Sequence, residues 1–527
     1  MRNFLSKLKS KEVHVRLKDG ELSVHMPKSG VDGNLVEEIR ARKEELIQYL
    51  SELNAPTSQI PIVPQATDYE LSSAQYRLWV LSQTIEGNLA HTIPGFYELK
   101  GSLDLAALQE AFDHIIERHD SLRTIFVEKE NGTVRQKILV HEAAGAHIKF
   151  KNLTDFKNAE ELIDQEINAL LSEPFELAAG PLIRVRLYQL ANERYVFGYT
   201  MHHIISDGWS MEVLIGELFN LYSAFTQGLQ SPLKPLKIQY KDYAVWQKTK
   251  LSGQSSYKKY WLKSFEGDIP VLELPSDKPR PVVKTFPGNG FEKRINDNTS
   301  AKLQQICKEN GATIFMGMVT CLNALFSKLS GQHDVVLGTP IAGRESVELE
   351  EQIGLYINTL AIRSQFSETD SFTSLLNKTK EAMIGAFAHQ QYPFDKLVED
   401  LQVKRDVSRN PLFDVLVTYR EEQMSGQQDD QGLAGIEISS YGADDELISK
   451  FDLTFTFQDS EDYLDVNVVY NTDLYFPSTI EKMLEQFELV LNTWTENVNL
   501  ELEKISLLLP TEIESISKFN STHVEHK

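Results

Sequence analysis

The sequence predicts a mixed α/β protein of two subdomains, preceded by a small separate module. Segments with the periodicity of strands and of helices alternate from about residue 68 onward. That region spans about 440 residues, which is too long for one compact core. The stretch APTSQIPIVPQAT at 55–67 holds three prolines and is typical of a linker. The three observations together predict the division of the chain.

The first 54 residues predict a hairpin followed by a helix. The stretch EVHVRLKDGELSVHMP alternates apolar and polar residues on both sides of an Asp19-Gly20 turn, which is typical of a hairpin with one buried face. The stretch LVEEIRARKEELIQYLSEL then places Leu35, Ile39 and Leu46 at helical spacing. We therefore expect a small module here that stands apart from the rest of the chain.

Strands and helices alternate in both expected subdomains, residues 68–250 and 251–510. In the first, LAALQEAFDHIIERH predicts a helix, RYVFGYTMHH a strand buried on both faces, and SMEVLIGELFNLYSAF the helix after it. In the second, the expected strands are DVVLGTPIA, YINTLAIR, FDLTFTF and YLDVNVVYN, and the closing helix is STIEKMLEQFELVLNTW. The Pro- and Gly-rich loop GDIPVLELPSDKPRPVVKTFPGNG lies near the break between them.

Composition limits the kinds of partner. The net charge is −23, which disfavours general binding to nucleic acids or anionic membranes. Two cysteines, with no CxxC pair, exclude a disulfide scaffold and suit a reducing compartment. No apolar run has the length of a signal peptide core or a membrane span, so we expect a cytoplasmic protein.

Residues 1–50 carry ten Lys/Arg against eight Asp/Glu, which indicates an acidic partner for the module or, alternatively, a solvated surface.

The stretch YTMHHIISDGWSM contains the candidate catalytic residues. His202 and His203 end the expected strand, and Ser210 is expected to cap the next helix. Adjacent strand residues point to opposite faces, so only one of the two rings can face a given cleft and a metal site is disfavoured. Two histidines satisfied within the core are the alternative. No P-loop, GxSxG elbow or dinucleotide fingerprint is present. We therefore expect acid/base or positioning work on two bound substrates, as in acyl transfer to an amine or hydroxyl.

Seven motifs in order resemble one family over residues 68–510. They are LSSAQYRLWVL at 71–81, RHDSLRTIF at 118–126, MHHIISDGWS at 201–210, YKDYAVW at 240–246, IGLYINTLAIR at 353–363, HQQYPFD at 389–395 and RDVSRNPL at 405–412. The series resembles the condensation domains of nonribosomal peptide synthetases, whose signature is HHxxxDG and whose fold is related to chloramphenicol acetyltransferase. The resemblance implies two such subdomains in a V, with a central tunnel between them.

The module at 1–54 resembles the TubC-type docking domain found at the start of some synthetase subunits, which implies the order helix, strand, strand, helix (αββα). That resemblance implies that the hairpin binds the acidic C-terminal peptide of an upstream subunit by strand addition. Lys11, Arg16 and Lys18 are the residues expected to complement its charge. The end of the chain, residues 511–527, resembles the start of a linker into an adenylation domain, which we expect to follow in the same subunit.

The resemblance also assigns residues. His203 matches the second, catalytic histidine of the family, and backbone amides near Gly208 are expected to stabilise an oxyanion. Asp207 is expected to form a structural ion pair with Arg344 or Arg118, and His202 to pack into the sheet. The positions assigned to the tunnel are Trp209, Ser210 and Asn358, with a core position for Trp209 and a structural role for Asn358 as alternatives.

The function implied is peptide-bond formation between a donor aminoacyl or peptidyl thioester and the α-amine of an acceptor aminoacyl thioester. Both substrates are expected on the phosphopantetheine of upstream and downstream carrier proteins, and we expect this chain to bind no cofactor or metal itself. Two alternatives stay open: an epimerisation domain, which shares HHxxxDG, and a non-catalytic scaffold that recruits carriers or tailoring enzymes. Whether His203 acts as a general base or as a positioning group is also left open.

Overall fold

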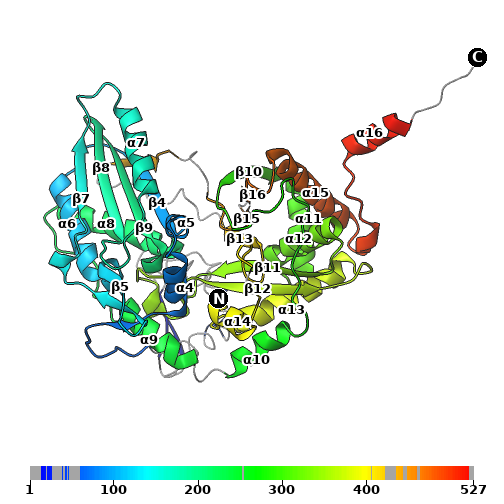
Figure 1. Ribbon diagram of the computed structural model, residues 1–527, viewed down its shortest axis with the longest axis horizontal. Coiled ribbons are helices and arrows are strands. Elements are labelled where there is room, and N and C mark those ends of the chain that lie inside the picture. Colours follow the sequence, from blue (N-terminus) through cyan, green and yellow to red (C-terminus); the bar gives the residue numbers. More distant parts are fainter. Residues whose placement is uncertain are drawn as a thin grey trace, which may run out of the picture.

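The structure is a computed structural model of the chain (Figure 1). The residues that it describes are 14–18, 21–25, 38–39, 42–43, 46, 60–251, 255–404, 406–421, 435–442, 448–459 and 463–520.

The predicted hairpin is present near the N-terminus. Strand β1 (His14–Lys18) pairs antiparallel with β2 (Glu21–His25). Val15 lies opposite Val24 and Leu17 opposite Leu22, so these apolar residues share one face of the ribbon, as their alternation predicted. Arg16 and Lys18 lie in β1, whereas Lys11 and the first helix expected for the module lie outside the described residues.

The second helix of the module is described at a few positions. The amide of Arg42 donates to the carbonyl of Glu38 at 3.1 Å, and the amide of Leu46 donates to the carbonyl of Arg42 at 2.9 Å. These are the i to i−4 bonds of an α-helix. Ile39 and Leu46, two of the residues at helical spacing, are buried.

The N-terminal subdomain is built on a five-stranded sheet with the order β14-β4-β9-β8-β7 (Figure 1). Its strands are β4 (Thr92–Lys100), β7 (Ile148–Asn152), β8 (Ile183–Ala191), β9 (Arg194–His202) and β14 (Glu437–Ser440). A smaller sheet joins β3 (Tyr69–Glu70), β5 (Thr124–Glu128) and β6 (Val134–Ile138). The helices are α4 (Ser73–Leu81), α5 (Ile85–Ala90), α6 (Leu105–Arg118), α7 (Ala159–Ser172), α8 (Gly208–Phe225) and α9 (Tyr240–Leu251). Strand β9 is buried at every position after the first, as its continuous apolar run predicted.

The C-terminal subdomain is built on a six-stranded mixed sheet with the order β10-β16-β15-β13-β11-β12. Its strands are β10 (Gly288–Ile295), β11 (Asp334–Ile341), β12 (Asn358–Gln365), β13 (Val415–Glu421), β15 (Leu453–Asp459) and β16 (Leu464–Asn471). Its helices are α10 (Ser255–Ser264), α11 (Asp297–Glu309), α12 (Ile314–Ser330), α13 (Phe372–Ala388), α14 (Phe394–Asp400) and α15 (Pro477–Glu496), followed by α16 (Pro510–Asn520). The two subdomains form a V that opens toward the top of Figure 1.

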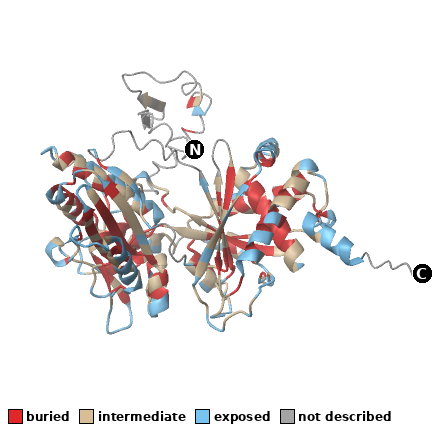
Figure 2. Ribbon diagram, turned by 90° about the horizontal axis from the view of Figure 1, so that it is seen from above, coloured by how far each residue is buried: buried red, intermediate tan, exposed pale blue. Residues whose placement is uncertain are grey.

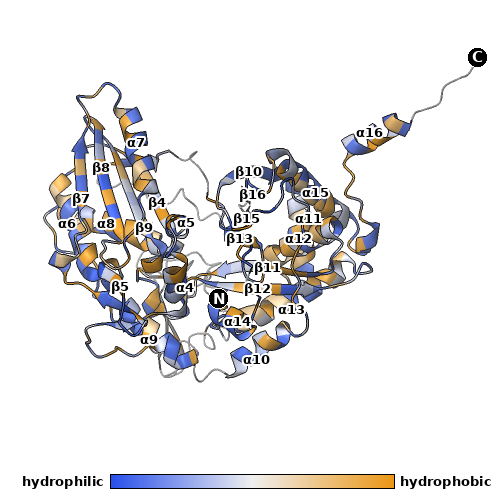
Figure 3. Cartoon of the chain, in the orientation of Figure 1, coloured by the Kyte–Doolittle hydropathy of each residue, from blue (hydrophilic) through white to orange (hydrophobic). Residues whose placement is uncertain are grey.

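Each subdomain has its own hydrophobic core. Figure 2 shows buried residues gathered on the sheets of both bodies, while α16 at the C-terminal end is exposed. Hydrophobic residues also gather on α12 and α15, which cover the larger sheet (Figure 3). The apolar stripe predicted for α15 is buried from Ile480 to Trp494. Trp261 and Phe265 pack into the C-terminal core, so the chain enters that subdomain before the Pro- and Gly-rich loop.

Two segments cross between the subdomains. Strand β14 comes from the C-terminal half of the chain but pairs with β4 of the N-terminal sheet, with Glu437 opposite Lys100. Leu349, Ile353 and Tyr356 likewise belong to the N-terminal core. A division into residues 68–250 and 251–510 therefore describes the chain order, whereas the N-terminal subdomain also uses residues from the second range.

Within the described residues, no single helix is long and apolar enough to span a membrane. Helices α11 and α12 together have the length and composition of a membrane span, but the chain bends by 107° at the break between them.

Candidate active site

The HHIISDG stretch lies where β9 ends and α8 begins. His202 is the last residue of β9, His203 opens a short 3-10 turn, and Asp207 precedes the first residue of α8. The backbone amide of His203 donates to the carbonyl of His91 at 2.7 Å, which extends the pairing of β4 with β9 by one residue. The two rings therefore leave the sheet on opposite faces, as the sequence predicted.

His202 is fully buried and both of its ring nitrogens have partners. Nδ1 accepts from the amide of Ile204 at 3.1 Å, so Nε2 carries the proton and donates to Ser82 Oγ at 3.1 Å. The ring also meets the edge of Phe175, with centroids 5.9 Å apart. Burial, then the charges of His203 and Lys450, lower the pKa of His202 to about 3. This histidine is a neutral part of the core.

His203 is partly buried and keeps one nitrogen free. Its Nδ1 lies 2.7 Å from the carbonyl oxygen of Ser206, which can only accept, so Nδ1 carries the proton. Nε2 therefore has a lone pair, and no described residue bonds to it. Burial and the charge of Lys450 lower the pKa of His203 to about 4, although Asp207 acts in the opposite direction. At neutral pH the ring is an uncharged hydrogen-bond acceptor.

Asp207 is the hub of a buried polar cluster. One oxygen, Oδ1, accepts from the amide and hydroxyl of Ser210 at 2.9 and 2.6 Å and from Arg344 at 3.0 Å. The other, Oδ2, accepts from the amides of Tyr356 at 2.9 Å and Ile357 at 3.3 Å. Because Arg344, Tyr356 and Ile357 belong to the second half of the chain, this carboxylate joins the turn after β9 to the segment before β12. Its role in this geometry is structural.

Arg344 rather than Arg118 makes the ion pair with Asp207. The Arg344 guanidinium is fully buried, also donates to the carbonyl of Gln352 at 2.6 Å, and lies 4.3 Å from the centre of the Tyr356 ring. The expectation for Arg118 is wrong, since its Nε donates to Glu217 at 2.9 Å on α8. Arg118 therefore links α6 to α8 and does not support the histidine turn directly.

Ser210 differs from its prediction in two respects. The residue that caps α8 is Asp207, whose side chain accepts from the Ser210 amide. Ser210 itself is fully buried and its hydroxyl contacts Asp207, Arg344 and the backbone of Gly354, so it has no access to a tunnel. Ser and Asp are both good capping residues, and the sequence pattern does not distinguish them when they lie three residues apart.

The structure bears on the alternatives given for Trp209 and Asn358. The indole Nε1 of Trp209 donates to the carbonyl of Glu350 at 2.9 Å, and the residue is 38% exposed, so it does not lie in the core. The Asn358 amide donates to the carbonyls of Gln390 and Tyr392, both at 2.9 Å, and accepts from the Phe394 amide at 3.0 Å. Every polar group of the Asn358 side chain is used within the fold, which corresponds to the structural alternative.

Gly208 leaves the start of α8 open. A Cβ atom added to Gly208 would meet nothing within 4 Å. The first amides of a helix have no partner inside the helix, and those of Gly208 and Trp209 have none among the other described residues. Both residues are exposed, so the start of α8 offers two backbone donors five and six residues after His203.

Two residues near the histidines were not predicted. His91 ends α5, and its Nδ1 lies 2.6 Å from the carbonyl oxygen of Gly87. Lys450 lies just before β15, and its charge lowers the pKa of His91, His202 and His203. Burial lowers the pKa of Lys450 itself to about 8. A single histidine before a strand and a single lysine before another strand carry no sequence signal, because only the assembled fold brings them together.

Among the described residues, no group of three or more His, Cys, Asp or Glu side chains is arranged to hold a metal ion.

The geometry and the motif series agree with one family. The chain matches the condensation domain over residues 65–517 and the TubC N-terminal docking domain over residues 1–52. It therefore belongs to the condensation domains of nonribosomal peptide synthetases, with a docking domain before the condensation domain.

Curated relatives are much longer than this chain. Surfactin synthase subunit 1 of Bacillus subtilis (strain 168) is 37% identical over 458 residues, which cover 86% of this chain and 12% of the relative. Tyrocidine synthase 2 of Brevibacillus parabrevis is 35% identical over 482 residues, which cover 90% of this chain and 13% of the relative. The chain thus spans only a small part of the length of these relatives.

Solved structures share the fold. The X-domain from teicoplanin biosynthesis, solved in a complex with OxyB, aligns with a TM-score of 0.77 and 25% identity, over 86% of this chain and 98% of the other. The first condensation domain of the calcium-dependent antibiotic synthetase aligns with a TM-score of 0.65 and 19% identity, over 84% of this chain and all of the other. These similarities confirm the predicted chloramphenicol-acetyltransferase-like α/β architecture.

Proposed function

We propose that the chain joins two carrier-bound substrates through an amide bond. The donor is an aminoacyl or peptidyl thioester, and the acceptor is an aminoacyl thioester whose α-amine attacks the donor carbonyl carbon. Upstream and downstream carrier proteins supply both on phosphopantetheine arms, which meet in a tunnel between the subdomains. The docking domain recruits an upstream subunit through its acidic C-terminal peptide, in the cytoplasm, and an adenylation domain of the same subunit loads the acceptor.

The observation that carries this proposal is the free Nε2 of His203. The bond from Nδ1 to the Ser206 carbonyl fixes the tautomer and holds the ring in place. The pKa of about 4 keeps the ring neutral at pH 7, so Nε2 is ready to accept a hydrogen bond from an amine. A binding surface for carrier proteins would not need this arrangement.

The same low pKa separates two roles for His203. Proton transfer is most efficient when the pKa of the base lies near the working pH, and a base with a pKa of about 4 is weak by that standard. Orienting a bound amine needs only a well-placed acceptor and can lower the barrier substantially. We therefore assign His203 mainly to positioning the amine, so that its lone pair points at the thioester carbonyl.

The oxyanion formed by the attack needs donors. The open amides of Gly208 and Trp209 lie at the positive end of α8, which favours negative charge. They are the backbone groups that we assign to the developing oxyanion. No side chain is required for this step.

The test is a single-turnover reaction between a donor-loaded and an acceptor-loaded carrier, followed by intact mass spectrometry of the acceptor carrier. The wild type is compared with His203→Ala and His203→Gln. We expect His203→Ala to slow product formation by about 100-fold or more. Glutamine can place an acceptor oxygen near the position of Nε2 but cannot take up a proton. His203→Gln should therefore retain much of the rate if the ring positions the amine, and should match His203→Ala if it is a base.

A recruiting scaffold is the second candidate function. It is favoured by the X-domain from teicoplanin biosynthesis, which shares this fold and was solved with OxyB as its partner. Carriers that bind without any product, across several loaded pairs, would contradict condensation and support the scaffold. Inversion of the donor α-carbon without chain extension would instead indicate an epimerisation domain.

A further inference from the structure

A second histidine, His91, lies next to His203 at the end of the β4–β9 ladder. Thr92 of β4 pairs with His202 of β9, and the next bond of the ladder joins the His203 amide to the His91 carbonyl at 2.7 Å. His91 and His203 are therefore neighbours just beyond the last pair of the ladder, and the charge of His203 contributes to lowering the pKa of His91.

His91 has the same tautomer as His203. Its Nδ1 lies 2.6 Å from the carbonyl oxygen of Gly87, so Nδ1 carries the proton and Nε2 keeps a lone pair. No described residue bonds to Nε2, and the side chain is only partly buried. Burial, followed by the charge of Lys450, lowers the pKa of His91 well below its ordinary value, so the ring is neutral at pH 7.

We propose that His91 is the second imidazole that holds the acceptor amine. Nε2 of His203 accepts one N–H of the attacking amine, and Nε2 of His91 accepts the other. This inference rests on the proposed function and adds a residue outside the HHIISDG stretch. With both N–H groups held, the lone pair of a primary amine has one direction left, toward the donor carbonyl carbon.

Neither histidine has to keep a proton in this arrangement. Attack forms the C–N bond and breaks the C–S bond of the donor thioester. The nitrogen loses one proton in the reaction, and the departing phosphopantetheine thiolate gains one. The proton lost by the acceptor is therefore the proton gained by the donor's leaving group. The histidines act as hydrogen-bond acceptors that fix the geometry before attack.

The arrangement predicts a preference among acceptors. A primary amine offers two N–H groups, whereas a secondary amine, such as an N-methylated or proline-type residue, offers one. Only primary amines can use both imidazoles. The structure thus assigns this chain to primary-amine acceptors.

The test compares His91→Phe with His91→Gln, which are matched because both lose the bond from Nδ1 to Gly87. Phenylalanine keeps a ring without an acceptor, and glutamine can return an acceptor near the position of Nε2. Single-turnover rates are measured with alanyl and N-methylalanyl acceptor carriers, and folding is checked by thermal melting. We expect His91→Phe to slow the alanyl reaction about 10-fold and to leave the N-methylalanyl reaction within about 3-fold of wild type. His91→Gln should recover most of the alanyl rate.

Two results would overturn the inference: an unchanged ratio of alanyl to N-methylalanyl rates in His91→Phe, or a His91→Gln variant as slow as His91→Phe. If His91→Phe does not fold, His91→Leu removes the same acceptor with a smaller side chain. Failure of the proposed function is distinguishable, because the wild type would then form no product with either acceptor.

Discussion

Each subdomain contains a buried strand that leads, after five residues, into a long helix. In the N-terminal subdomain β9 ends at His202 and α8 begins at Gly208, and in the C-terminal subdomain β16 ends at Asn471 and α15 begins at Pro477. The first turn carries His203 and Asp207 and directly follows His202. The second buries Leu474 and Tyr475 in its core.

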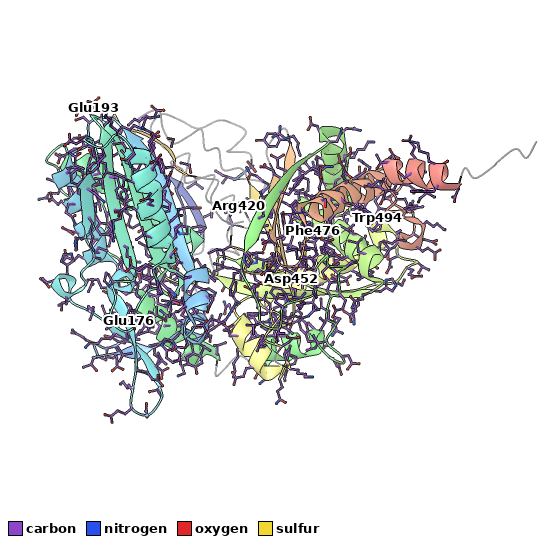
Figure 4. All side chains as sticks on the ribbon, turned by 45° about the horizontal axis from the view of Figure 1, so that its top comes forward. Glu176, Glu193, Arg420, Asp452, Phe476 and Trp494 are labelled. Carbon is purple, nitrogen blue, oxygen red and sulfur yellow. The ribbon has the colours of Figure 1, made fainter. Side chains whose placement is uncertain are left out.

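The two turns are also held differently. The first supplies its own cap, Asp207, which also binds Arg344 from the second half of the chain. The second has no side-chain cap at Phe476, which Figure 4 labels, and is held instead by Asp277, which accepts from the Phe476 amide and the Thr479 hydroxyl. A turn between a strand and a helix is therefore not a site by itself. The chemistry depends on polar side chains in the turn and on the segment from the second half of the chain that fixes them.

Removing Asp207, the cap of the first turn, should have the largest effect on both stability and activity. In Asp207→Ala, the Arg344 guanidinium stays buried without its partner, which costs about 3–5 kcal/mol of the free energy of unfolding. The same change should reduce product formation, since it releases the turn that carries His203. Urea denaturation measures the first effect and the carrier assay the second.

The double variant Asp207→Ala/Arg344→Met is the control for this prediction. It removes both charges, so it should recover part of the lost stability. An Asp207→Ala variant with the stability and activity of wild type would contradict the role that we give to the cluster.

Removing the positive charge of Lys450 should have an intermediate effect, on the pKa of His203. Lys450→Met removes a positive charge that disfavours the imidazolium form, so the pKa of His203 should rise from about 4 toward its ordinary value of 6.5. NMR titration of ring-labelled histidines measures this directly, with His203→Ala to assign the signal. Lys450→Arg keeps the charge and should keep the low pKa. Identical titration curves for Lys450→Met and wild type would show that burial alone sets the pKa.

Removing the side chain that holds the second turn should have the smallest effect on stability and activity. Asp277 is exposed and accepts two hydrogen bonds, 2.7 Å from the Phe476 amide and 2.9 Å from the Thr479 hydroxyl. Asp277→Ala should cost about 1 kcal/mol in urea denaturation and leave the rate of product formation unchanged. A large loss of activity would mean that the two turns are not independent, whereas Asp277→Asn should restore most of the stability.

Much of the fold could be predicted because the hydrophobic pattern within each segment agrees with the element that the segment forms. The uninterrupted apolar run of β9, the stripe from Ile480 to Trp494 and the hairpin alternation each predicted an element that the structure contains. These patterns depend on periodicity within one segment, which a single sequence displays. Strand alternation predicted that only one of the two histidines can face a given cleft, and the family resemblance assigned the packed position to His202, which the structure buries fully.

The remaining features depend on which segments meet in the folded chain. The sequence offered Arg344 and Arg118 for Asp207, and only the packing of the segment before β12 against the turn decides between them. His91 could not be found, because its place opposite His203 follows from the register of β4 against β9. Ser210 and Asn358 looked available for substrate until the structure showed the partners that occupy their polar groups.

The pairing of β14 with β4 has a consequence for how the protein is made. The partner of Lys100 is Glu437, so 337 residues must be synthesised after Lys100 before that part of β4 gains its outer neighbour. At about 5–20 residues per second this delay lasts roughly 20 to 70 s. During that interval the nascent sheet ends in an uncovered edge, which is where chains aggregate. A ribosome-bound chain truncated before residue 437 should therefore need chaperone protection that the complete chain does not.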